Sequence, residues 1–459
     1  MIYSSLLFIY GFLPVSLLLY YLTPKKLREI MLLILSIAFC GLVSLYFMIF
    51  ILWFTVVNYL FTHLIGRARK NEKLAAVPLA AGIIIDLVAL LAFRTEYVLW
   101  LRRLIRAPES FYPVGISFFA LGAIGTLIDV YKGRIKADRC FTRYGLYIMF
   151  FPRLIMGPLL RYRVFTNILD NRCESLSGMG VGMSLFVKGL AKKVIAADTL
   201  YMLYTAAGNE PVDEMSAVTA WLGVVAFIFC LYFELSGLAD MGMGTAYCFG
   251  LKLPQSFNYP LLSTRIKYFT TRWQSQTVQW IRRYITKPLY GVCPKKWIRE
   301  TVFVAGWGIF GLWYVFDLNG LIWGLLMGLA ALIESRLSRN KVMNFTGIIY
   351  TFLVVILCGV FLSGDSPAYS VRYLFAMIGG NGVIADAQAF YLFKSYIVLL
   401  LVTMYASTDL FRNLMTRSGR NRFKTAVMVV SPVLVLAVLI ICTALISYSG
   451  SSEMLLMKL

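Results

Sequence analysis

The chain has 459 residues, of which 60% are hydrophobic and only 14% are charged, and its mean hydropathy is +0.75. A soluble domain carries about a quarter charged residues, and no water-soluble fold could hide this much apolar surface. The composition therefore excludes a soluble enzyme and predicts a membrane protein. The net charge of +22 would suit nucleic acid, but the basic residues gather in short loops between apolar runs. That pattern is typical of the positive-inside rule, so we expect membrane lipid as a partner and no nucleic acid.

Apolar runs that could span a bilayer recur along the chain. The clear candidates are Ile2–Leu22, Ile30–Tyr46, Phe47–Ile65, Leu74–Phe93, Ala217–Leu235, Thr301–Phe316, Leu321–Leu332, Phe345–Leu362, Tyr391–Met404 and Thr425–Tyr448. Further apolar stretches, broken by Pro and Gly, are Val114–Val130, Tyr144–Leu160 and Met179–Tyr204. Because a span needs about 20 residues, we expect about 10 to 13 helices. Breaks at membrane depth are tolerated where the backbone lines a cavity, so we predict an all-α polytopic membrane protein with re-entrant helices around a central tunnel. No long polar linker divides the chain, which predicts one transmembrane domain over residues 1–459.

The loops predict the orientation. Basic residues in 66–73, 336–341 and 409–424 indicate the cytoplasmic side, whereas 364–388 holds a single basic residue, Arg372. The first run has no basic residue before it and several after it, which predicts an uncleaved first span. We therefore expect both termini to be extracytoplasmic.

The segment 262–299 differs from the spans. It interleaves basic residues with Tyr268, Phe269, Trp273, Trp280 and Tyr284. Such a pattern is typical of amphipathic helices at a membrane surface, so we expect one or two helices at the cytoplasmic interface with the aromatic rings at headgroup level. The alternative is a simple surface anchor.

Few residues offer acid–base chemistry. His63 is the single histidine and ends an apolar run, so an interfacial role is expected for it. The cysteines show no CxxC spacing, which argues against a metal site. Ionisable residues in apolar runs are costly and count as functional candidates. These candidates are Asp86, Arg153, Glu234 and Asp240, each with a structural hydrogen-bonding role as the alternative; we favour that role for Asp86.

Several short motifs in order resemble a known family. They are Phe150-Phe151-Pro152 with Gly157-Pro158, Lys192-Lys193-Val194 with Asp198, Tyr232-Phe233-Glu234 with Ser236-Gly237 and Asp240, Arg272-Trp273, Gly311-Leu312-Trp313, and Trp323-Gly324. The chain resembles the membrane-bound O-acyltransferases (MBOAT), in the bacterial branch of alginate O-acetyltransferases and the teichoic acid D-alanyl transfer protein. The resemblance implies a ring of helices pierced by a tunnel, in a bacterial cytoplasmic (inner) membrane. It also implies transfer of an acyl group from a cytoplasmic thioester or acyl carrier to an extracytoplasmic hydroxyl, with no tightly bound cofactor.

The chain departs from the family at each position where the resemblance places a histidine. These positions hold Gln274, Tyr314 and Met327. Attack of a hydroxyl on a thioester needs a base whose pKa lies near ambient pH. Gln and Met cannot supply one, and a tyrosine ordinarily titrates near pH 10. The resemblance assigns five further residues to the tunnel or to binding: Arg153, Ser236, Arg272, Trp273 and Trp313.

Three hypotheses follow. The first is a catalytically inactive or repurposed member that serves cell-envelope polymer O-acylation or assembly, with an envelope-modification protein or an acyl carrier protein as partner. The second is an active O-acyltransferase that uses Tyr314, Glu234 and Asp240. The third is a lipid or acyl-carrier transporter that uses the same tunnel.

Overall fold

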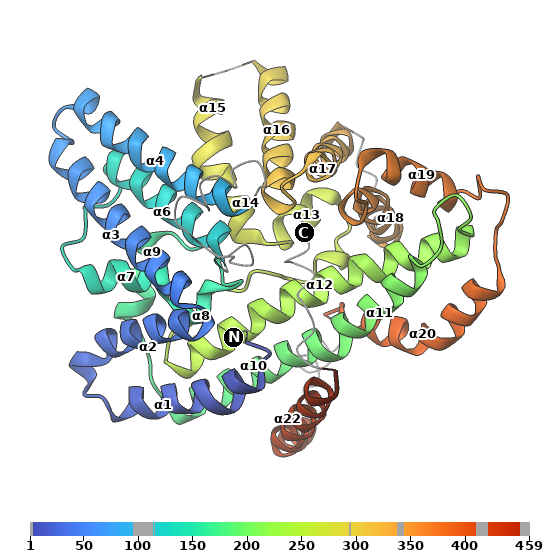
Figure 1. Cartoon of the computed structure of the whole chain (residues 1–459), viewed down its shortest axis with the longest axis horizontal. Coiled ribbons are helices and arrows are strands. Elements are labelled where there is room, and N and C mark those ends of the chain that lie inside the picture. Colours follow the sequence, from blue (N-terminus) through green and yellow to red (C-terminus); the bar gives the residue numbers. More distant parts are fainter. Residues whose placement is uncertain are drawn as a thin grey trace. The chain divides into compact units, whose positions relative to one another are not determined.

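The computed structural model describes residues 3–94, 113, 115–292, 295–336, 344–409 and 421–449. Every regular element in these residues is a helix (Figure 1). The chain divides into two compact units: residues 1–186 with 238–255, and residues 187–237 with 256–459. The predicted cytoplasmic loop over 409–424 and the tail over 450–459 lie largely outside the described residues.

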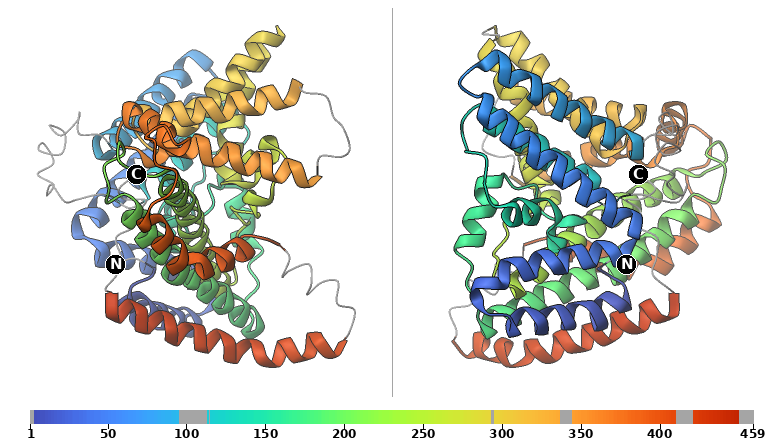
Figure 2. Two further views of the ribbon diagram at one scale, coloured as in Figure 1. Left: turned by 90° about the vertical axis from the view of Figure 1, so that its right-hand side faces the viewer. Right: turned by 60° about the vertical axis from the view of Figure 1, so that its left-hand side comes forward.

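Unit 1 begins with a run of antiparallel apolar helices. Its helices are η1 (Leu7–Phe12), α1 (Leu13–Leu22), η2 (Lys25–Leu27), α2 (Arg28–Val43), α3 (Leu45–Ala68), α4 (Glu72–Arg94), α6 (Ile116–Tyr131), α7 (Phe141–Met149), α8 (Phe151–Leu154) and α9 (Tyr162–Asp170). Helices α3, α4 and α6 pack on one another, and α3 and α4 lie side by side in Figure 2. The break between α2 and α3 falls at Ser44, whose backbone is extended, so the boundary predicted at Tyr46 was two residues late.

Two long helices supply residues to both units. Helix α10 (Leu176–Ala191) continues through η4 (Lys192–Ala197) into α11 (Asp198–Ala207), and α12 runs over Ala217–Cys248. The sequence predicted that the apolar helix starting at Ala217 ends at Leu235. This prediction was wrong, because Ser236 and Gly237 do not interrupt α12, which continues to Cys248. A Cβ on Gly237 would lie 2.7 Å from the carbonyl oxygen of Gly189, so the glycine permits close helix packing rather than a turn.

Unit 2 contains the remaining helices. They are η5 (Pro260–Leu262), α13 (Ile266–Arg272), α14 (Ser275–Ile281), η6 (Arg282–Thr286), α15 (Lys287–Val292), α16 (Lys296–Tyr314), α17 (Leu318–Arg336), α18 (Asn344–Ser363), α19 (Pro367–Met377), α20 (Ala387–Ala406) and α22 (Asn421–Ser449). The predicted amphipathic segment contains α13 and then one continuous helical stretch in which α14 passes through η6 into α15, as in the expected one or two helices, and α16 also starts inside it. Phe269 and Trp273 of this segment are packed inside the protein, at 2% and 3% exposed, and the headgroup level expected for its aromatic rings stays a prediction. Tyr268 on the same segment is exposed.

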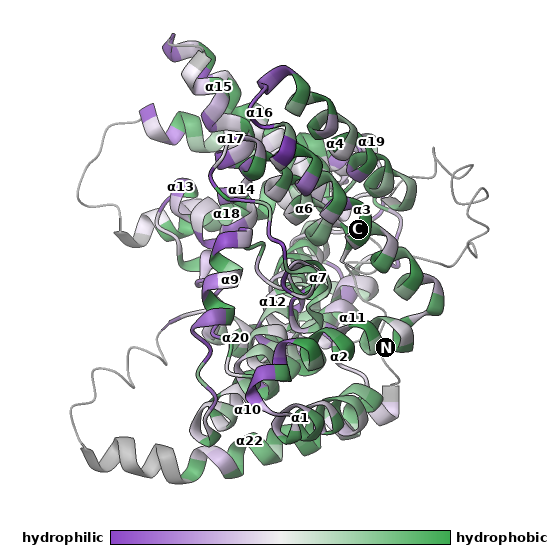
Figure 3. Cartoon of the chain, turned by 90° about the vertical axis from the view of Figure 1, so that its left-hand side faces the viewer, coloured by the Kyte–Doolittle hydropathy of each residue, from purple (hydrophilic) through white to green (hydrophobic). Residues whose placement is uncertain are grey.

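Seven described helices are long and apolar enough to cross a bilayer. They are Leu45–Ala68, Glu72–Phe93, Ala217–Cys248, Leu318–Arg336, Thr346–Ser363, Ala387–Ala406 and Val430–Tyr448. Figure 3 shows the predominance of apolar residues on α1 to α4 and on the described part of α22. Their exposed apolar side chains need a lipid solvent, so the protein is an integral membrane protein.

Candidate functional site

The junction between α13 and α14 holds Gln274, the first of the three positions where the sequence resemblance places a histidine. Gln274 adopts a left-handed backbone conformation with φ of 41° and is 3% exposed. Two backbone hydrogen bonds fix the junction: the N–H of Asn258 donates to the carbonyl of Arg272 at 3.1 Å, and the N–H of Ser275 donates to that of Ser256 at 3.0 Å. A left-handed conformation is uncommon outside glycine, so the surroundings hold Gln274 in place.

Trp273 anchors this junction in an aromatic cluster. Its ring centroid lies 5.4 Å from that of Phe269, 5.5 Å from Phe257 and 6.2 Å from Tyr232. Arg272, which precedes it, ends α13 and remains partly exposed. Of the predicted binding pair, Arg272 therefore lies at the edge of unit 2 and Trp273 lies in its interior.

The hairpin of α16 and α17 carries the other two positions. Tyr314 is 4% exposed and its ring lies 5.6 Å from that of Trp323, which precedes Met327 by one helical turn. Met327 has no exposed surface. Because residues four apart share a helix face, Tyr314, Trp323 and Met327 belong to one packed face of the hairpin.

Glycines bring these two helices unusually close. A Cβ on Gly311 would lie 2.0 Å from the carbonyl oxygen of Gly320, and a Cβ on Gly324 would lie 2.1 Å from that of Trp307. Small residues at such crossings allow backbone-to-backbone packing in membrane helices. The glycines of the two family motifs thus position Tyr314 and Met327.

Trp273 and Tyr314 connect the junction between α13 and α14 with the hairpin of α16 and α17. The Trp273 side chain lies beside the phenol of Tyr314. Trp313 packs against Tyr314 at a centroid distance of 6.3 Å. The structure therefore gathers Gln274, Tyr314 and Met327, which are far apart in sequence, in one buried part of unit 2.

A buried ion cluster lies in the same unit. The Lys193 ammonium is 2.7 Å from the carboxylate of Asp198 and 3.6 Å from that of Glu234. Lys193 is 2% exposed and Glu234 is 1% exposed. Lys193 belongs to the π-helical segment η4, and such segments occur frequently at functional sites. Glu234 also exerts an electrostatic influence on Tyr314, so the cluster is close to the aromatic region.

Sequence reasoning did not include Lys193 among the site residues. Lysine within the apolar stretch Met179–Tyr204 is itself a signal, because an ionisable residue in such surroundings needs a partner. The partner could not be identified from sequence, since Glu234 lies on another helix.

The other predicted residues are distributed over both units. Ser236 is buried in unit 2, and its hydroxyl makes no hydrogen bond with the described residues. Arg153 and Asp240 are buried in unit 1. Asp86 in unit 1 accepts a 2.7 Å hydrogen bond from the Asn58 amide, which agrees with the structural role favoured for it.

The histidine is also in unit 1. His63 Nδ1 lies 3.0 Å from the carbonyl oxygen of Tyr59 on the preceding turn of α3, and the two rings pack at 4.4 Å. Within the described residues, no group of His, Cys, Asp and Glu side chains is arranged to hold a metal ion.

Comparisons with known proteins give the family. Residues 140–340 match the model of MBOAT, the membrane-bound O-acyltransferase family. The chain is 31% identical to the Pseudomonas aeruginosa protein named "Probable alginate O-acetylase AlgI", over 82% of this chain and 75% of that one. It is 27% identical to the peptidoglycan O-acetyltransferase of Helicobacter pylori, over 83% and 81% of the two chains. It is 26% identical to the teichoic acid D-alanyltransferase of Bacillus subtilis, over 46% and 56%. The chain therefore belongs to the membrane-bound O-acyltransferase family.

Proposed function

We propose that this protein serves the O-acylation or assembly of a cell-envelope polymer, a polysaccharide or a teichoic acid, without the histidine-based transfer step of its family. One observation carries the proposal. The three positions where the family resemblance places histidine hold Gln274, Tyr314 and Met327, and all three are buried together in unit 2. A neutral amide and a thioether cannot exchange a proton near neutral pH.

The surrounding scaffold supports a retained role in the membrane. Gly311 and Gly324 keep the close contact of α16 with α17, and Trp273 keeps its aromatic neighbours. A chain that had lost all function would be free to lose these packing features as well. We propose that the scaffold forms a ring of about 10 to 13 helices around a tunnel, at about 20 residues per span. Its partner is an envelope-modification protein or an acyl carrier protein. The protein resides in the bacterial cytoplasmic membrane with both termini extracytoplasmic.

A second candidate function is active O-acyl transfer with other residues. The observation in its favour is the contact of the Tyr314 phenol with Trp273, near Glu234 and its ion pair with Lys193. In that reading the tyrosine donates a hydrogen bond to the oxyanion that develops on the thioester carbonyl. A transporter for lipid or acyl carriers is the third candidate, and it needs only the tunnel.

The experiment supplies the purified protein with an acyl thioester donor and a polysaccharide acceptor, and measures ester formed on the acceptor. We expect no turnover from the wild-type protein, together with a stable complex to another envelope protein on purification. Turnover that vanishes in Tyr314→Phe and survives in His63→Ala would overturn the non-catalytic proposal and identify Tyr314 as an active-site residue. The Tyr314→Phe change removes one hydroxyl and keeps the ring, so it tests the phenol alone.

A further inference from the structure

One buried carboxyl group in unit 1 has no part in the proposed function. Asp86 has no exposed surface and lies in the candidate span Glu72–Phe93 of α4. Helices α3 and α6 pack against α4. A Cβ on Gly82, one turn before Asp86, would lie 2.8 Å from the Leu127 side chain of α6, so these two helices are in close contact there. Protein therefore encloses the Asp86 carboxyl.

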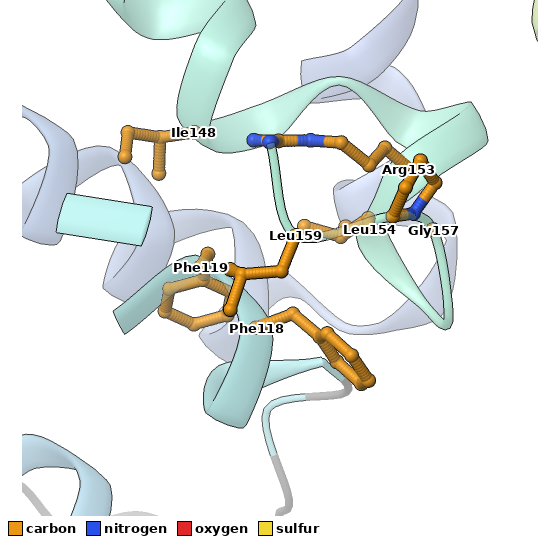
Figure 4. Close-up of a pocket in the computed structure, with 8 residues that line it drawn as sticks. Phe118, Phe119, Ile148, Arg153, Leu154, Gly157 and Leu159 are labelled. Atoms are coloured by element: carbon orange, nitrogen blue, oxygen red, sulfur yellow. The ribbon is translucent and has the colours of Figure 1, made fainter. Parts of the chain in front are cut away.

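No Lys or Arg of the described residues forms an ion pair with this carboxyl. Arg153 is a buried cation of the same unit, and Figure 4 shows its side chain extended toward Ile148. Its guanidinium donates a hydrogen bond to the Tyr147 carbonyl and lies 4.6 Å from the centre of the Tyr147 ring. An ionised Asp86 would be a buried negative charge without a counter-ion, which is costly.

The titratable groups on the helices around Asp86 do not compensate its charge either. On α3, His63 contacts a carbonyl of its own helix, and on α6, Asp129 pairs with Arg134 at 2.8 Å. The other charged residues of α4 lie at its ends: Glu72, Lys73 and Arg94. Tyr144 of α7 interacts electrostatically with Asp86, but its hydroxyl makes no hydrogen bond to any residue that the structure describes. An ionised carboxylate, which only accepts hydrogen bonds, would use such a donor.

A single amide group meets the carboxyl. Nδ2 of Asn58, on α3, donates to Oδ1 of Asp86 at 2.7 Å and to the carbonyl of Phe54 at 3.2 Å. The second bond fixes the orientation of the amide, since a flipped amide would turn its own oxygen toward that carbonyl. Two buried oxygens of this pair, Oδ2 of Asp86 and Oδ1 of Asn58, make no hydrogen bond within the described part of the chain.

One proton accounts for both of these oxygens. While Asp86 is ionised, both are acceptors and neither can bond to the other. A proton on Oδ2 turns the carboxyl into an O–H donor. The acid and the amide can then form a closed ring of two hydrogen bonds, which needs no space beyond that of the two side chains.

We propose that Asp86 is a proton-binding site: the folded protein holds its carboxyl as the neutral acid, which donates from Oδ2 to Oδ1 of Asn58 and so joins α4 to α3. The proton comes from water and returns to water when the chain unfolds. Release of the proton in the folded state would leave a buried negative charge facing an amide oxygen. The pairing of the two helices is therefore sensitive to pH.

This inference does not depend on the proposed function. Asn58 and Asp86 belong to unit 1, whereas Gln274, Tyr314 and Met327 belong to unit 2.

Infrared difference spectroscopy of the purified full-length protein in detergent tests the protonation state. A neutral carboxyl has its C=O stretching band at higher wavenumber than a carboxylate, because its double bond is localised. At neutral pH we expect the wild-type minus Asp86→Asn spectrum to contain a neutral-carboxyl band. Asp129→Asn is the matched control, because Asp129 is also buried but pairs with Arg134, so its spectrum should contain carboxylate bands alone. Carboxylate bands in place of the neutral band for Asp86→Asn would overturn the proposal.

A second variant decides the matter if Asp86→Asn fails to fold. Asn58→Leu keeps the carboxyl and removes the amide that bonds to it. We expect a neutral-carboxyl band to move to higher wavenumber in this variant, because the Asp86 carbonyl loses its hydrogen-bond donor. A neutral-carboxyl region identical to that of the wild type would rule out the shared proton.

Thermal unfolding at a series of pH values gives an independent readout. An aspartate in the unfolded chain is ionised above about pH 4, whereas the folded site keeps its proton. The unfolded chain then binds fewer protons, so this group lowers the ratio of folded to unfolded protein about tenfold per pH unit as pH rises. Asp86→Asn has no such proton to release, so its melting temperature should gain on that of the wild type with rising pH. A difference between the two that is independent of pH would refute a proton held by Asp86.

Discussion

The ammonium of Lys193 lies 3.6 Å from the carboxylate of Glu234, and both side chains are almost completely buried. Taking both charges from water is expensive, and their attraction offsets this cost only while both partners are present. The two residues come from different helices of unit 2, η4 and α12. Their pairing therefore contributes to holding these helices together.

The first prediction is that Lys193→Met destabilises the protein by about 3–5 kcal/mol, because it leaves Glu234 buried without its cation. The double variant Lys193→Met with Glu234→Gln should recover part of the loss, since it removes both charges. Thermal unfolding in detergent measures both effects. Lys296→Met, at an exposed position on α16, is the matched control and should change stability by less than about 0.5 kcal/mol. Equal losses in Lys193→Met and in the control would disprove the structural importance of the pair.

A second prediction concerns the crossing of α16 and α17. Gly324→Ala places a methyl group 2.1 Å from the Trp307 carbonyl oxygen, so the helices must separate. We expect a loss of about 1–3 kcal/mol, as for overpacked cores. Gly180→Ala on α10 adds the same methyl where no atom lies within 4 Å. That control should be neutral or slightly stabilising, because alanine favours helix by about 1 kcal/mol. Similar melting temperatures for the two variants would contradict the close crossing.

The third prediction uses the backbone of Gln274. Its φ of 41° is accessible to glycine without strain, whereas alanine in this region costs about 1–2 kcal/mol. Both Gln274→Gly and Gln274→Ala lose the buried side chain, so their difference isolates the backbone. We expect the glycine variant to be the more stable by about 1 kcal/mol. An alanine variant as stable as the glycine variant would show that the junction relaxes to another conformation.

The sequence predicted the apolar helices well and the junctions between them less well. Hydropathy identifies runs such as Leu74–Phe93 because their lipid-facing and buried residues are both apolar. It cannot place the break at Gln274, because neither Trp273 nor Gln274 is a turn-forming residue. The basic residues around Trp273 are typical of a side chain at a membrane surface. In the folded protein, however, contacts with Phe257 and Phe269 bury the Trp273 side chain.

The ordered motifs proposed Gln274, Tyr314 and Met327 as site positions, but they could not predict how these residues are arranged. Their convergence depends on the glycine crossing of two helices and on the Trp273 contact with Tyr314, which local pattern does not encode. The Lys193 ion pair was missed for the same reason.

A fourth prediction concerns topology. The residues between α3 and α4 should face the cytoplasm, and those between α19 and α20 should face the exterior. We expect Asn71→Cys to resist a membrane-impermeant thiol reagent in intact cells and Ala385→Cys to react, in a background that lacks the exposed Cys140 and Cys173. Both engineered positions are exposed, so access depends on the side of the membrane. Labelling of both cysteines from the outside would refute the predicted orientation.

The last prediction is that His63→Ala leaves the activity of the protein intact, whatever that activity proves to be. His63 is the only histidine of the chain, so a histidine-based transfer step could depend on no other residue. It lies in unit 1 near the end of α3, where its ring packs on Tyr59 of the same helix. None of Gln274, Tyr314 and Met327 belongs to that unit. We expect polymer O-acylation in cells to be unchanged and stability to fall by about 1 kcal/mol, because the half-buried ring of His63 packs on Tyr59. Tyr59→Phe is the companion variant, because it keeps the ring that supports His63 and removes only the hydroxyl bonded to the Arg139 carbonyl. Loss of O-acylation in His63→Ala, with normal protein levels and normal function in Tyr59→Phe, would mean that the lone histidine acts in the reaction.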